Sequence, residues 1–100
     1  MKVRLVQSGG FLGIVRSCEL DTSALGPDAA AELERLVRGS GIKASGEHLS
    51  ESGRDLHVYE ITIEDEDRTW TVVFDDASLP PAVKPVIGYL RERARPGPPG

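Results

Sequence analysis

The sequence predicts an α+β protein in which an antiparallel sheet of about four strands, formed by two hairpins, carries two helices packed on it. The strands are predicted most clearly by segments 59–64 and 70–74, where bulky apolar residues recur at every second position. The helices are predicted by segments 30–37 and 79–94, where apolar residues recur at steps of three and four. The expected order is therefore β-β-α-β-β-α, with each hairpin followed by a helix.

The first predicted hairpin joins strand 2–7 to strand 14–20 through the glycine-rich segment 8–13. Three glycines within five positions indicate a tight turn, because glycine adopts backbone angles that other residues avoid. The second strand alternates imperfectly, since Arg16 shares the parity of the apolar Ile14. We therefore expect a bulge or an edge strand there.

The length and the breaker residues define one domain. A chain of 100 residues has room for a single core, which we place in residues 1–95. Pro27 suits the first turn of the first helix, and Gly39 suits its end. The polar segment 43–54 is expected to be a mobile loop, and the Pro/Gly-rich tail 96–100 is expected to be disordered.

Charge and cysteine content narrow the partners and the compartment. Twelve basic and sixteen acidic residues give a net charge of −4, which disfavours binding to nucleic acid. The basic cluster of Arg91, Arg93 and Arg95 fits the negative end of the last helix. The single cysteine, Cys18, excludes an internal disulfide and suits a reducing compartment. Neither a signal peptide nor a membrane span is recognisable, so we expect a cytoplasmic protein that does not bind membranes.

The sequence offers little for catalysis or metal binding. His48 and His57 are nine residues apart and belong to no HExxH or CxxC motif. Cys18 has apolar neighbours, which is typical of an inert buried thiol. The acidic residues at 65–67 and 75–76 are expected to be open to solvent with ordinary pKa values. We therefore predict a protein that is not an enzyme and that uses no metal and no cofactor.

The glycine-rich segment carries two bulky apolar residues, Phe11 and Leu12, where solvent exposure is expected. Two interpretations remain open: Phe11 folds back to cap the core, or it is an anchor that binds a partner. A third interpretation uses the backbone of Gly9 and Gly10 as a nest for a phosphate group. No helix begins after these glycines, so that signal is weak.

Segments 3–13, 59–63, 70–76 and 79–80 resemble the emfourin family. Members of that family are small cytoplasmic bacterial proteins that inhibit protealysin-like metalloproteases, a branch of the thermolysin group. The resemblance implies an α+β protein without catalysis of its own, whose partner is a thermolysin-like zinc metalloprotease. We expect it to be a monomer when free. The alternative is a non-enzymatic interaction or adaptor module with a different partner.

The resemblance also implies a binding mode. Thermolysin-like enzymes prefer a bulky apolar residue after the scissile bond and accept an extended strand beside their own sheet, so Phe11 or Leu12 would fill the enzyme's pocket. The predicted partner-binding residues are those of the glycine-rich segment: Ser8, Gly9, Gly10, Phe11, Leu12 and Gly13.

Overall fold

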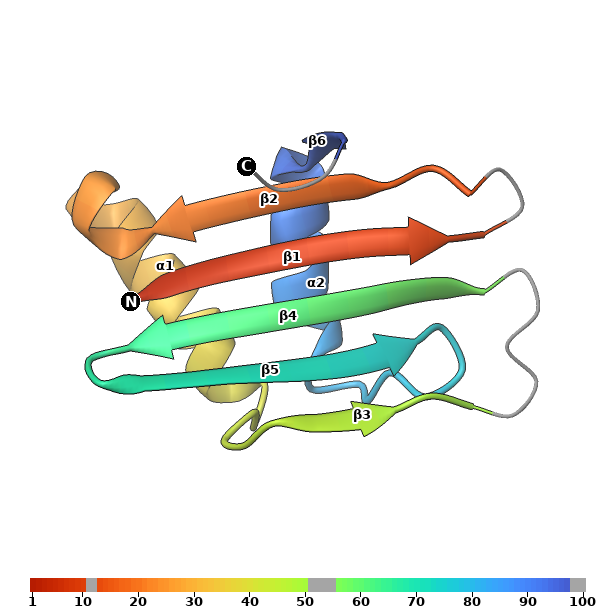
Figure 1. The fold of residues 1–100 in the computed structure, drawn as a ribbon. Coiled ribbons are helices and arrows are strands. Elements are labelled where there is room, and N and C mark those ends of the chain that lie inside the picture. The colour runs from red at the N-terminus through yellow and green to blue at the C-terminus, as the bar shows by residue number, and fades with distance from the viewer. Residues whose placement is uncertain (11–12, 51–55, 98–100) are drawn as a thin grey trace.

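The computed structural model describes residues 1–10, 13–50 and 56–97, and every structural statement below concerns those residues. They form one six-stranded sheet of order β3-β5-β4-β1-β2-β6, and both α-helices lie on the same face of it (Figure 1). In chain order the elements are β1 (Lys2–Gly9), β2 (Arg16–Asp21), the 3-10 helix η1 (Thr22–Ala24), α1 (Pro27–Gly39), β3 (Gly46–His48), β4 (His57–Asp65), β5 (Arg68–Asp75), α2 (Lys84–Arg93) and β6 (Arg95–Pro96).

The α+β class and the two helices agree with the prediction, but the expected four-stranded antiparallel sheet is wrong. The four predicted strands are present as the antiparallel neighbours β5, β4, β1 and β2. At one edge β3 pairs with β5 in the parallel direction, so the sheet is mixed, and at the other edge β6 pairs with β2. These strands have three and two residues. Segments that short cannot display the alternation by which a strand is recognised.

Both additional strands include residues that were expected to have no regular structure. β3 falls inside segment 43–54, so the prediction of a mobile loop is wrong for Gly46–His48. β6 includes Pro96, and the next residue, Gly97, donates its backbone N–H to the carbonyl of Val15 at 2.8 Å. The polypeptide is therefore paired with β2 beyond the end of α2, up to Gly97.

The arrangement of β1 decides where the glycine-rich segment lies. β1 pairs with β2 on one side and with β4 on the other, and the β4 pairing runs from Lys2 opposite Glu64 to Gly9 opposite His57. The glycine-rich segment therefore leaves β1 at the end of the sheet where β4 begins and β5 ends (Figure 1).

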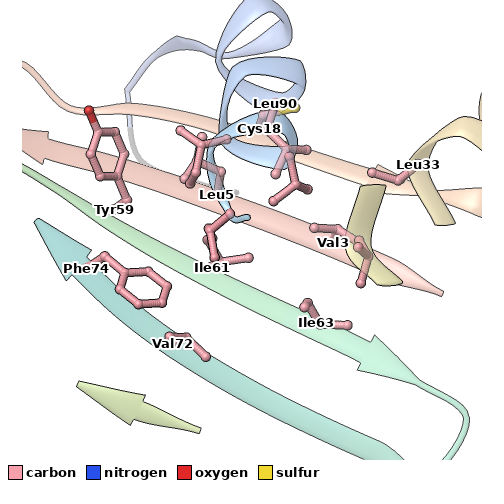
Figure 2. Packing of buried hydrophobic residues seen from close by; sticks show 14 residues of the cluster. Val3, Leu5, Cys18, Leu33, Tyr59, Ile61, Ile63, Val72, Phe74 and Leu90 are labelled. Atoms are coloured by element: carbon pink, nitrogen blue, oxygen red, sulfur yellow. The ribbon is translucent and has the colours of Figure 1, made fainter. Parts of the chain in front are cut away.

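The core lies between the sheet and the two helices. Val3 and Leu5 alternate with the partly exposed Lys2 and Arg4, and Figure 2 shows the two apolar side chains on the side of the helices. Leu33 of α1 and Leu90 of α2 complete the same apolar cluster and are fully buried. The buried apolar residues are Val3, Leu5, Cys18, Leu33, Val37, Tyr59, Ile61, Ile63, Val72, Phe74, Val83, Val86, Ile87 and Leu90. Burial of this surface holds both helices against one face of the sheet.

The helix ends follow from the local sequence. α1 has Pro27 at its first turn and ends at Gly39, where Ser40 donates its backbone N–H to the carbonyls of Leu36 and Val37. α2 carries Pro85 in its first turn, where a missing N–H removes no helical hydrogen bond. Among the described residues, no helix has the length and apolar character that a membrane crossing requires.

Candidate functional site

The glycine-rich segment begins within β1 and ends shortly before β2. Ser8 and Gly9 are the last residues of β1, and Gly10 forms a bend. Gly9, Gly10 and Gly13 have φ angles of 81°, 78° and 62°, the left-handed region that favours glycine. Phe11 and Leu12 lie outside the described residues, so the choice between a core cap and a partner anchor stays a prediction.

Close contacts with the start of β4 fix the first two glycines. The backbone N–H of Gly10 donates to the carbonyl of Leu56 at 3.1 Å, and that of Gly13 donates to the carbonyl of Gly10 at 3.3 Å. A Cβ atom at Gly9 would lie 2.6 Å from the Leu56 oxygen, and one at Gly10 would lie 2.8 Å from Nε2 of His57. Backbone conformation favours glycine at both positions, and at Gly9 the fixed backbone oxygen of Leu56 also leaves no space for a side chain.

A hydrogen-bonded cluster of His57, Tyr59 and Asp76 supports this end of the sheet. Oδ2 of Asp76 accepts the backbone N–H of His57 at 2.8 Å and lies 3.2 Å from its Nδ1, while Oδ1 accepts the hydroxyl of Tyr59 at 2.6 Å. Burial and the bond to Asp76 raise the pKa of Tyr59 to about 12. Burial raises the pKa of Asp76, but the hydrogen bonds from Tyr59 and His57 outweigh this effect and hold it below its ordinary value.

The role of this cluster is to position the imidazole of His57. Asp76 orients the imidazole of His57, as a carboxylate does in many acid–base pairs, but Nε2 of His57 faces the backbone of Gly10. The imidazole therefore packs against the base of the glycine-rich segment.

The only cysteine, Cys18, is buried in the core, and its burial raises the pKa of the thiol.

The neighbouring Asp75 was expected to be open to solvent, and this prediction is wrong. Asp75 is buried, with only 2% of its surface exposed. Its carboxylate accepts the N–H and the hydroxyl of Ser50 at 2.6 and 2.7 Å, and the N–H groups of Ala77 and Ser78 at 2.9 and 2.8 Å. The hydrogen bonds from Ser50, followed by those from Ser78, outweigh the effect of burial and lower the pKa of Asp75 to about 2. The carboxylate thereby ties the segment after β3 to the turn after β5.

A concavity of about 720 Å³ opens beside the glycine-rich segment, between the end of the sheet and α2. We call it the basic concavity, because its lining includes Arg16 of β2 and Arg91 of α2 as well as His57. The guanidinium of Arg91 lies 5.9 Å from the centre of the Tyr59 ring. Its full lining is Gln7, Gly9, Gly10, Ile14, Arg16, His57, Gly88, Arg91 and Glu92.

The sequence did not identify this concavity. Arg91 was assigned to the end of a helix and Arg16 to an imperfect strand, and His57 belonged to no recognised metal motif. They meet because β2 and β4 both border β1 and because α2 crosses the same face. No spacing in the sequence signals that meeting, since it depends on the order of the strands.

A second concavity, of about 500 Å³, lies at the opposite edge of the sheet, between the segment after α1 and the start of α2. Its wall includes His48, whose ring is stacked on Phe74 with 5.3 Å between the ring centres. Leu49 follows His48 and is 47% exposed. Within the described ranges, no three His, Cys, Asp or Glu side chains are grouped so that they could hold a metal ion.

Fold and site together describe a small α+β protein with a glycine-rich segment beside a basic concavity. Residues 5–91 match the Emfourin family, so the chain belongs to that family and the resemblance found in the sequence is confirmed. Emfourin is a family of protease inhibitors. No curated protein matches the chain, and neither does any solved structure.

Proposed function

We propose that the protein inhibits a thermolysin-like zinc metalloprotease by placing the glycine-rich segment, residues 8–13, in the active-site cleft of the enzyme. The observation that carries the proposal is membership of an inhibitor family over residues 5–91, a range that includes the whole segment. We further propose that the protein has no catalysis of its own and acts in the cytoplasm.

The geometry on either side of Phe11 and Leu12 supports this binding mode. Gly9 and Gly10 precede them and are held by Leu56 and His57, while Gly13 follows them and is bonded back to Gly10. A segment held at both ends loses little conformational entropy when it binds, which favours affinity. In our proposal Phe11 or Leu12 fills the apolar pocket of the protease, and the backbone pairs with the edge of the cleft. In our proposal the held ends also hinder alignment of the bound segment with the attacking water, so that cleavage is slow.

A panel of thermolysin-like proteases, assayed with a quenched fluorescent peptide, tests the function. We expect near-stoichiometric inhibition of at least one enzyme. Failure of the protein to inhibit any of them would contradict the proposal and favour an adaptor with another partner.

The binding mode is tested with Phe11→Ala, Leu12→Ala and the double variant. Loss of an aromatic anchor costs about 2 kcal/mol, so Phe11→Ala should raise the inhibition constant roughly 30-fold if Phe11 fills the pocket. Leu49→Ala is the matched control, because it removes an exposed apolar side chain outside segment 8–13. If both single variants and the double variant inhibit like the parent protein, the segment is not the part that enters the cleft.

A further inference from the structure

The basic concavity has a charge opposite to that of the whole protein. The chain carries a net charge of −4. In the concavity, Arg16 and Arg91 face one acidic side chain, Glu92, and His57 adds an imidazole. Local charge of the sign opposite to the net charge is a property of surfaces that bind charged partners.

Neither nearby carboxylate pairs with Arg16 or Arg91. Glu92 lies 3.7 Å from the guanidinium of Arg93, and Asp76 is bonded to Tyr59 and His57. Within residues 1–10, 13–50 and 56–97, neither Arg16 nor Arg91 forms an ion pair. Both guanidinium groups therefore lack a salt-bridge partner among the described residues, and Glu92 is the one carboxylate in the lining of the concavity.

The shape of the concavity suits an extended segment of another protein. Gly9, Gly10 and Gly88 contribute no side chains to its wall, so a partner backbone can approach closely. A Cβ atom at Gly88 would meet no other atom within 4 Å, which leaves that side open. Ile14 is 46% exposed and adds an apolar contact next to the charges. Arginine beside apolar surface is typical of the residues that contribute most to protein interfaces.

We propose that the basic concavity binds a carboxylate side chain of the partner protein, an Asp or Glu that pairs with Arg16 and Arg91 while residues 8–13 bind next to it. Guanidinium groups bind carboxylates through paired, charge-assisted hydrogen bonds, so an acidic side chain is the group that arginines without a salt-bridge partner favour in this concavity. For the protease as partner, this inference rests on the proposed function. The chemistry of the concavity can be tested without it.

The first experiment measures inhibition by Arg16→Ser/Arg91→Ser. The matched control is Arg38→Ser/Arg68→Ser, which also changes the net charge from −4 to −6 but at exposed positions away from the concavity. We expect the first variant to raise the inhibition constant about tenfold or more and to lose most of its dependence on salt between about 50 and 500 mM NaCl. The control should keep both the inhibition constant of the parent protein and its dependence on salt. Urea unfolding verifies that all variants are folded, and equal inhibition constants for the two variants would overturn the proposal.

The second experiment needs no protease. Amide NMR follows titration with the peptide acetyl-Gly-Glu-Glu-Gly-amide and with its Gln-Gln analogue. Shifts at Gly10, Arg16 and Arg91 with the acidic peptide alone support the proposal, whereas shifts with both peptides, or with neither, contradict it. If the peptide binds but no protease is inhibited, the proposed function fails and the carboxylate site stands. If a protease is inhibited but the arginine double variant and the peptide titration both give negative results, the proposed function stands and the carboxylate site fails.

Discussion

Replacing Gly9 by alanine tests whether close packing, and not only backbone conformation, fixes the glycine-rich segment. Gly13 is the internal comparison, since both residues have positive φ but only at Gly9 would an added Cβ atom have a neighbour within 4 Å. Alanine in the left-handed region costs about 1–2 kcal/mol. Reduced freedom of the unfolded chain offsets about 0.4–1 kcal/mol of that cost. We therefore expect Gly13→Ala to lower the free energy of unfolding by roughly 1 kcal/mol.

At Gly9 a further cost arises, because the new methyl group would lie 2.6 Å from the carbonyl oxygen of Leu56. That oxygen accepts the N–H of Gly10 at 3.1 Å, so moving it weakens a hydrogen bond worth about 1 kcal/mol and strains the pairing of β1 with β4. Gly9→Ala should therefore cost about 2–3 kcal/mol in total.

The assay is urea unfolding followed by the fluorescence of Trp70, the only tryptophan in the chain. In thermal unfolding, the same extra cost corresponds to a melting temperature of Gly9→Ala that is lower by about 5–15 °C than that of Gly13→Ala. Equal stabilities, within about 0.5 kcal/mol, would refute the argument that Leu56 excludes a side chain at Gly9.

Two further predictions concern pH. The pKa of Asp75 falls from 3.8 to about 2 on folding, so its contribution to stability is present above pH 3.8 and is lost as the pH falls toward 2. Asp75→Asn should make the urea midpoint less dependent on pH in that range, and an unchanged dependence would contradict this. The pKa of Tyr59 rises from 10.0 to about 12, so its contribution is complete below pH 10 and is lost as the pH rises toward 12. Tyr59→Phe should flatten that alkaline decline, measured by circular dichroism, and a decline as steep as that of the parent protein would rule out the hydroxyl as its source.

The hairpin of β4 and β5 was predictable because each strand is long enough to show its own period. Ile61 and Ile63 alternate with polar residues, and their partners across the hairpin, Val72 and Trp70, also stand at every second position of an apolar face. The edge strands were not predictable in this way. β3 forms only where the outer side of β5 is available, so its position depends on tertiary structure and not on a local preference.

The candidate site was predictable only in part, for a related reason. The glycines of segment 8–13 show in the sequence that the chain turns there, and the structure gives Gly9 and Gly10 a left-handed backbone. The burial of Asp75 depends on Ser50, which is 25 positions away, and the hydrogen-bond partner of His57 is 19 positions away at Asp76. Hydrogen-bonded pairs so far apart in the chain cannot be recognised in a single sequence, because no local feature distinguishes a bonded carboxylate from a solvated one.

The central position of β1 has a consequence for synthesis. Gly9 pairs with His57, which follows it by 48 positions, so β1 is made well before its partner β4. At a translation rate of roughly 5–20 residues per second, the edge of β1 that pairs with β4 stays unpaired for several seconds. β2 is made sooner, but a two-stranded hairpin alone is only marginally stable in water. During that interval the nascent hairpin exposes Val3 and Leu5, which are fully buried in the folded domain, so a ribosome-associated chaperone can bind the hairpin there.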